Sequence, residues 1–152
     1  MSSRRRIAAL SVAAGVVVLG GAGAFAFAQA GEQDPTLAHS TARYTAPAGD
    51  HDGSLVFTTD VTASSGVKSL KVLAWPAGSE IGKDVTAKEM AEVESATCKP
   101  AADDTARCTY TAPVTATDAA ASPHGTWHIA VLATAKNGTK TLDNKAADFK
   151  IG

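Results

Sequence analysis

The sequence GTWHIAVLATAKNG, residues 125–138, contains the strongest strand pattern of the 152-residue chain. Side chains two positions apart share a face of a strand, and the large apolar residues of this stretch follow that spacing. One face would carry Trp127, Ile129, Val131 and Ala133, and the other His128, Ala130, Leu132 and Thr134. Asn137-Gly138 comes next, the pair that best tolerates positive φ at both centres of a two-residue hairpin turn. We therefore expect a long strand that ends in a tight hairpin.

Shorter alternating segments lie on both sides of this strand. They cover residues 55–61, 68–75, 92–98, 107–114 and 147–151, and residues 99–106 read as a polar loop between two of them. Turn residues separate the segments about every ten residues. Residues 86–89 fit a capping box for one helical turn, and residues 118–122 predict another, but no long helix pattern occurs. Six or seven short strands of this kind favour an all-β fold, either an antiparallel two-sheet sandwich or a barrel.

The first 30 residues have the three parts of a secretory signal peptide. Three arginines at 4–6 precede an uncharged run over residues 7–30, which ends in Ala28-Gln29-Ala30. We expect cleavage between Ala30 and Gly31, with a second candidate site after Ala28, and hence a secreted protein. The alternative is an uncleaved anchor, because 24 uncharged residues can span a bilayer. The weakening of the run into glycine and alanine favours cleavage, and general export is favoured over a twin-arginine route.

Net charge and the distribution of apolar residues argue against nucleic-acid and membrane partners. Without the first 30 residues, which hold three arginines and no acid, 11 basic residues face 15 acidic ones, a net charge of −4. A nucleic-acid-binding protein would carry a Lys/Arg stripe, so we expect no nucleic-acid partner. No second long apolar run follows, so we expect no membrane contact after cleavage. Residues 31–50 are rich in Ala, Thr and Pro and predict a flexible linker or loosely attached leader, with 43–46 as a short edge strand. The globular domain is then expected over residues 51–152.

Cys98 and Cys108 are the only cysteines of the chain. In an exported protein they should be oxidised together, which predicts a disulfide across a hairpin. A zinc site needs three or four ligands, and no histidine lies near them in sequence. A catalytic thiol is disfavoured because the pair leaves no free cysteine.

No segment carries a convincing catalytic or metal-binding pattern. On a strand His124 and His128 would lie about 13 Å apart, too far to share a metal, and we interpret them as solvent-facing. Residues 50–53 resemble a fragment of a calcium loop that lacks its third acid and distal glutamate. The glutamates at 89, 92 and 94 have polar neighbours, which predicts a solvated face. We therefore expect no catalytic residues, no metal and no cofactor, and no enzyme activity.

Trp75 and Leu73 share the strand face opposite Leu70 and Val72. If this face is exposed, Leu73 and Trp75 form the best candidate contact patch of the chain. The favoured alternative is that Trp75 packs under the loop that follows Pro76.

Several segments resemble known bacterial domains. DVTASSGVKSLKVLAWP (60–76) is similar to the early strands of bacterial immunoglobulin-like domains, and GTWHIAVLATAKNGTKTL (125–142) to their late-strand signature, although Lys136 stands near the usual acid. Together with VESATCKP and ARCTYTAPV, they resemble a family of small secreted actinomycete (actinobacterial) proteins known as a domain of unknown function. The resemblance covers about residues 52–151. It implies an immunoglobulin-like sandwich of about seven strands behind a signal peptide helix, and it implies no activity or ligand.

These observations favour a secreted, monomeric, non-enzymatic module that binds an unknown protein or cell-surface partner. The alternative is an extracellular small-ligand carrier or a protease-inhibitor-like protein. A carrier requires a lined apolar pocket. An inhibitor requires a rigid loop, and residues 99–107 lack an apolar anchor for a specificity pocket.

Overall fold

The computed structural model describes residues 33–152. The expected signal peptide, the cleavage site between Ala30 and Gly31 and the first two residues of the expected linker lie outside the described residues. Within residues 33–152, no helix is both long and apolar enough to cross a bilayer.

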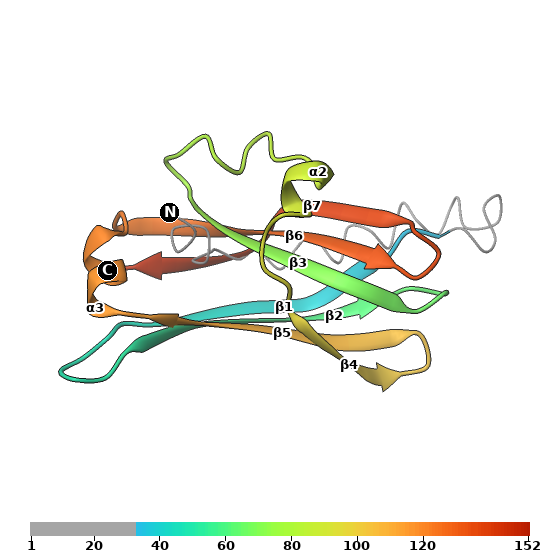
Figure 1. The fold of residues 1–152 in the computed structure, drawn as a ribbon, viewed down its shortest axis with the longest axis horizontal. Helices are drawn as coiled ribbons and strands as arrows, with labels where there is room; N and C mark the ends of the chain where they lie inside the picture. The colour runs from blue at the N-terminus through green and yellow to red at the C-terminus, as the bar shows by residue number, and fades with distance from the viewer. Residues whose placement is uncertain (1–32) are drawn as a thin grey trace.

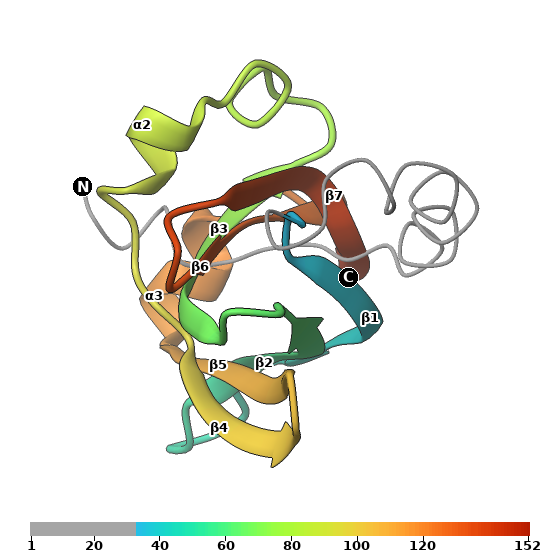
Figure 2. The ribbon, with the colours of Figure 1, turned by 90° about the vertical axis from the view of Figure 1, so that its right-hand side faces the viewer.

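Within the described residues, seven strands form two antiparallel sheets that pack face to face, and two short helices lie in the connections between strands (Figures 1 and 2). The strands are β1 (Thr36–Thr45), β2 (Gly53–Thr62), β3 (Val67–Pro76), β4 (Thr97–Ala102), β5 (Thr105–Val114), β6 (Gly125–Ala135) and β7 (Lys140–Ile151), and the helices are α2 (Ala87–Met90) and α3 (Ala116–Ala121). One sheet has the order β1-β2-β5-β4 and the other β3-β6-β7. This is the strand order of constant-type immunoglobulin domains. The expected all-β sandwich is confirmed.

The main core lies between the two sheets and follows the predicted alternation. Every second residue of β2 from Leu55 to Val61 is buried, and the same holds for β5 from Cys108 to Val114. From the opposite sheet, Trp127 and Ile129 of β6 enter the same core. The predicted inward faces of these strands are therefore confirmed.

A second, smaller core covers the outer face of the β3-β6-β7 sheet. Its buried residues are Leu73, Trp75, Met90, Ala130 and Leu132. Residues 77–96, which include α2, fold over this face and will be called the excursion (Figure 2). Leu73 is only 4% exposed and Trp75 only 1%. The proposed contact patch at these two residues is therefore wrong, and the packed alternative is confirmed.

Asn144 fastens the excursion to the sheet. The register of β7 against β6 shifts between Ile129 and Val131, so that Asn144 sits in an irregular stretch of β7. Its carbonyl accepts a hydrogen bond from Trp75 Nε1 at 2.9 Å. Its side-chain Nδ2 donates to the carbonyls of Gly82 and Lys83 at 3.2 and 3.1 Å. The irregularity thus leaves Asn144 of an edge strand available to form hydrogen bonds that hold the excursion against the sheet.

The expected linker is largely a strand, which corrects the domain boundary. Thr36–Thr45 pairs along β2 as β1 and buries Leu37. The register shifts between Ala38 and Thr41, where His39 adopts a φ of 54°. Because this shift interrupts the period of two, the sequence pattern of β1 does not look like a strand. At the shift, the hydroxyls of Ser40 and Thr59 are hydrogen-bonded at 2.7 Å in the interior.

The strand predicted at residues 92–98 and the loop predicted at 99–106 are also corrected. The strand is Thr97–Ala102, and it pairs with β5 around a turn at Asp103 and Asp104. Pro100 fits inside β4 because β4 is an edge strand, where one side needs no N–H donor.

The hairpin between β6 and β7 differs from the expected two-residue turn. Gly138 N donates to the Ala135 carbonyl at 2.9 Å, and Ala135 N donates to Thr139 O at 2.9 Å. Gly138 has a φ of 93°, whereas Asn137 does not have a positive φ. The loop is therefore a three-residue turn with glycine in the left-handed position.

Candidate binding groove

The outer face of the β1-β2-β5-β4 sheet carries a row of four threonines. Thr41 pairs with Thr58, Thr58 with Thr109, and Thr109 with Thr97, so each strand of the sheet contributes one residue. Threonine suits exposed strand positions because its branched side chain fits the pleated surface. The row therefore needs no ligand to explain it, but it gives this face a continuous line of hydroxyl groups.

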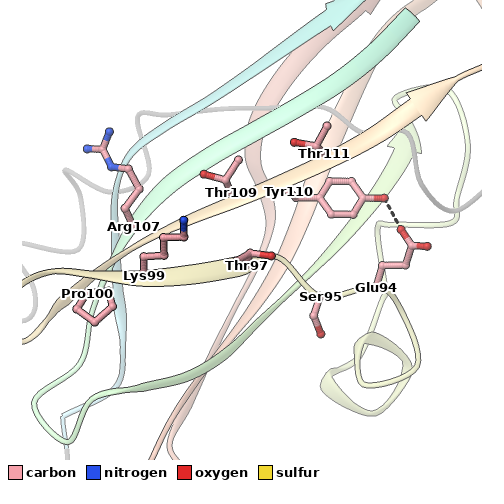
Figure 3. Close-up of a pocket in the computed structure, with 9 residues that line it drawn as sticks. All are labelled: Glu94, Ser95, Thr97, Lys99, Pro100, Arg107, Thr109, Tyr110 and Thr111. Atoms are coloured by element: carbon pink, nitrogen blue, oxygen red, sulfur yellow. Dashed lines mark hydrogen bonds between the residues drawn. The ribbon is translucent and has the colours of Figure 1, made fainter. Parts of the chain in front are cut away.

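At the β4 end of this row the surface is hollowed into a groove of about 840 Å³. The groove forms because β4 begins opposite Thr109, while the preceding chain crosses to the other sheet. There Ala96 N donates to the Leu70 carbonyl at 2.8 Å, and Val72 N donates to the Glu94 carbonyl at 2.9 Å. The lining residues are Glu94, Ser95, Thr97, Lys99, Pro100, Arg107, Thr109, Tyr110 and Thr111 (Figure 3). Most of them present a hydroxyl or a charge.

Two cations stand at one end of the groove. Arg107 on β5 and Lys99 on β4 are directly opposite each other in the ladder. Arg107 donates from Nε and Nη2 to the two carboxylate oxygens of Asp60, at 2.9 and 3.1 Å. His39 Nδ1 lies 3.1 Å from the same carboxylate. Partial burial raises the pKa of Asp60, but the hydrogen bonds and positive charges of Arg107 and His39 outweigh it, so the pKa of Asp60 falls below its ordinary value.

The other end of the groove carries a carboxylate. The Tyr110 hydroxyl donates to Glu94 Oε2 at 2.7 Å, as Figure 3 shows. Tyr110 belongs to the main core and also lines the groove. Glu94, which the sequence placed on a solvated face, is exposed but positioned by this bond. The groove therefore runs from a positive end to a negative end.

The predicted disulfide between Cys98 and Cys108 is present beside the groove. The two residues are directly opposite in the β4–β5 ladder, and Cys108 is fully buried in the main core. The disulfide thus holds β4, and with it Thr97 and Lys99, against β5.

The interpretation of His128 as solvent-facing is wrong. Its side chain is 14% exposed, and its Nδ1 lies 2.6 Å from Asp148 Oδ1 on the neighbouring strand. Its ring also lies against the Trp75 indole, with 4.7 Å between centroids. His124, by contrast, is exposed just before β6. The two histidines are therefore not brought together, and His128 belongs to the packing around Trp75.

The remaining sequence candidates lie in turns and caps. Residues 50–52 form the exposed end of the β1–β2 hairpin, closed by a bridge between Ala48 and His51, and Gly53 is the buried first residue of β2. Glu89 completes the capping box of α2 with Thr86, as predicted. Over residues 33–152, no group of three or more His, Cys, Asp or Glu side chains is placed to hold a metal ion.

Sequence reasoning did not find the groove. It assigned Lys99 to a polar loop, because the position of Lys99 depends on how β4 pairs with β5. The signal available in the sequence was the hairpin implied by the two cysteines, which places Lys99 opposite Arg107 once the cysteines are aligned.

The larger part of the chain matches a known protein family. Residues 37–133 match a protein family described as a family of unknown function (DUF5707). No curated protein and no solved structure matches the chain.

Proposed function

The chain belongs to this family of unknown function, and we propose that it is a secreted, immunoglobulin-like, non-enzymatic module that binds a protein or cell-surface partner through the groove beside β4. The groove carries the proposal. Its volume of about 840 Å³ lies within the range of about 300–1,000 Å³ that is usual for ligand sites. Its walls offer convergent hydroxyl groups and charges, which position a polar ligand.

The chemistry of the groove supports binding rather than catalysis. Its nine lining residues include hydroxyls, two cations and one carboxylate, but no histidine or cysteine. A hydroxyl nucleophile requires an adjacent base, and the one carboxylate, Glu94, is already bonded to the Tyr110 hydroxyl. The lining side chains are therefore suited to recognition.

A location outside the cell is supported by two features. The arginines at 4–6 and the apolar run after them have the order of a signal peptide, and Cys98 and Cys108 are oxidised. We infer export with cleavage after Ala30, after which the module works as a monomer without a membrane anchor.

The small-ligand carrier is the weaker alternative. The more apolar pocket under the excursion is lined by Leu73, Ile81, Val85, Glu89, Glu92 and Val93. Its volume is about 190 Å³, below the usual range for ligand sites. The protease-inhibitor alternative loses support because residues 99–107 form a paired hairpin and not a projecting loop.

The test is a capture experiment with a blocked groove. The oxidised protein, recovered from the producing cell's culture supernatant, serves as bait for envelope and supernatant extracts, and its intact mass reports whether it begins at Gly31. Thr109→Arg fills the groove. Thr41→Arg makes the same change in the same row of threonines, but on β1 and outside the groove.

We expect one partner to be captured by the wild-type protein and by Thr41→Arg, and to be lost with Thr109→Arg. Capture that is unaffected by Thr109→Arg, or no specific partner with any bait, would contradict the proposed function.

A further inference from the structure

We propose that the groove recognises an acidic, extended polypeptide segment, and that Lys99 and Arg107 together hold an acidic side chain of that segment. This inference rests on the proposed function and adds the chemical class of the partner.

The pairing of Lys99 with Arg107 is the first argument. Directly opposite residues on antiparallel strands have Cβ atoms about 4.5–5.5 Å apart, and like charges in such positions are destabilising. Asp60 balances the charge of Arg107 through two hydrogen bonds. Lys99 has no ion pair or hydrogen bond of its own in the described part of the chain. A ligand carboxylate could therefore compensate the charge of Lys99 and accept a hydrogen bond from Arg107 Nη1, the guanidinium nitrogen that the two bonds to Asp60 do not use.

The neighbouring side chains supply neutral donors. Thr97 and Thr109 form the next pair on the same face of the ladder, and both line the groove (Figure 3). Their hydroxyls can donate to a ligand oxygen beside the two cations. The site therefore offers a ligand carboxylate both positive charge and neutral hydrogen-bond donors.

A free strand edge is the argument for a polypeptide ligand. β5 continues to Val114, but β4 pairs with it only up to Thr109, so the later residues of β5 pair with β2 alone. Thr111 lies on this uncovered stretch and lines the groove. An extended segment can add to such an edge through its main chain, and pockets beside the edge then select its side chains.

The other edges are protected. β1 and β7 lie side by side, where Thr141 Oγ1 donates to the Pro35 carbonyl (Figure 2). Residues 94–96 cover β3, and Pro100 interrupts the outer edge of β4. Pro113, which has no N–H, limits the free stretch of β5. Because so few main-chain bonds are available there, the acidic side chain is expected to be the anchor.

The experiment follows amide shifts of the oxidised, ¹⁵N-labelled protein by NMR during titration. The probes are a twelve-residue peptide of alternating Glu and Thr, the same peptide with Gln in place of Glu, and polygalacturonate, an acidic polysaccharide. Each is added to the wild type, to Lys99→Gln and to Lys68→Gln. Lys68 is an exposed lysine of β3 in the other sheet, so its variant has the same loss of charge outside the groove.

We expect the Glu-Thr peptide to shift amides of Thr97, Lys99, Arg107, Thr109 and Thr111. Its affinity should fall about fivefold in Lys99→Gln and stay unchanged in Lys68→Gln. The Gln-Thr peptide and polygalacturonate should bind more weakly.

Three results would overturn the inference: no shifts in the groove with the Glu-Thr peptide, equal binding of the Gln-Thr peptide with no effect of Lys99→Gln, or tighter binding of polygalacturonate. The last two would leave the groove as a binding site and refute only its proposed ligand. The proposed function is tested separately by the capture experiment: it fails if Thr109→Arg leaves capture of the partner unchanged, or if no bait captures a specific partner.

Discussion

At the scale of single residues, Asp143 is an ionisable carboxyl group that the fold partly buries. It is half-buried on β7, opposite Val131, and its Oδ1 accepts a hydrogen bond from Lys145 N at 2.9 Å. Burial raises the pKa of Asp143 above 3.8, and the hydrogen bond from Lys145 only partly opposes this effect. Ionisation of Asp143 therefore lowers the free energy of unfolding.

The sign of this effect predicts the behaviour of Asp143→Asn. A raised folded pKa means that stability falls as the pH rises from 3.8 through the folded pKa, and that the penalty is complete above it. An amide keeps the acceptor for Lys145 without a charge, so we expect Asp143→Asn to raise the melting temperature at pH 7. The gain should vanish near about pH 3, where the aspartate is protonated in both states. Asp103→Asn, in the exposed β4–β5 turn, is the control. An equal gain at both pH values would contradict the charge argument.

The sequence pattern predicted burial correctly where burial depends only on alternation within one strand. Leu55, Phe57 and Ile129 could be assigned to the core from their spacing alone. The groove is different, since Thr97, Lys99 and Arg107 meet only through the pairing of two strands. His128 was misjudged for a related reason, because its partners Trp75 and Asp148 lie on the two neighbouring strands. Contacts across strands depend on register, which a single sequence does not show.

At the scale of elements, β4 depends unusually on the disulfide. None of its six residues is fully buried, and Cys98 is the only one that packs against the main core. Its contacts with the rest of the sheet are the ladder to β5 and the bond to Cys108. An edge strand without buried side chains is marginal by itself.

We therefore expect Cys98→Ala/Cys108→Ala to lower the free energy of unfolding by about 3 kcal/mol, the entropic estimate for a loop of this length. In the native state, amides of β4 should also lose protection from hydrogen exchange, while those of β2 and β6 keep theirs. Denaturant unfolding and exchange mass spectrometry measure the two effects. Wild-type protection of β4 in the variant would show that the ladder alone is sufficient.

The difference in burial between central and edge strands explains which strands could be predicted from the sequence. β2, β5 and β6 bury one face throughout, so their apolar alternation is visible. The edge strands β1 and β4 bury few side chains, and β1 and β7 contain register shifts. Their sequence patterns are therefore weak or interrupted, and three of the wrong predictions concern these strands. β1 was predicted as part of a linker, β4 was predicted too early at 92–98, and β7 was predicted only over 147–151 although it begins at Lys140.

At the scale of the whole molecule, two cores of unequal size share one sheet. Of the described residues, twenty form the buried cluster between the sheets and five the cluster beneath the excursion. Seven of the nine residues that line the groove lie on β4 and β5, the strands on the side of the molecule away from α2 (Figure 2), and the other two, Glu94 and Ser95, belong to the end of the excursion. Because stability follows buried contacts, the excursion should open more readily than the sandwich.

Gly82 gives a way to separate the two cores. It is buried against the Trp75 indole, and a Cβ at this position would clash with the ring, whereas a Cβ at Gly78 would meet nothing within 4 Å. We expect Gly82→Ala to displace the excursion, at a cost of about 1–3 kcal/mol for its local opening, and Gly78→Ala to have little effect. Faster exchange at residues 82–96 and a changed Trp75 emission should accompany unchanged protection of β2, β5 and β6. Glu94 and Ser95 of the excursion line one end of the groove, but Lys99 and Arg107 lie on β4 and β5 of the sandwich, so binding at these two cations should survive Gly82→Ala. Joint loss of protection in both cores would show that the molecule unfolds as one unit.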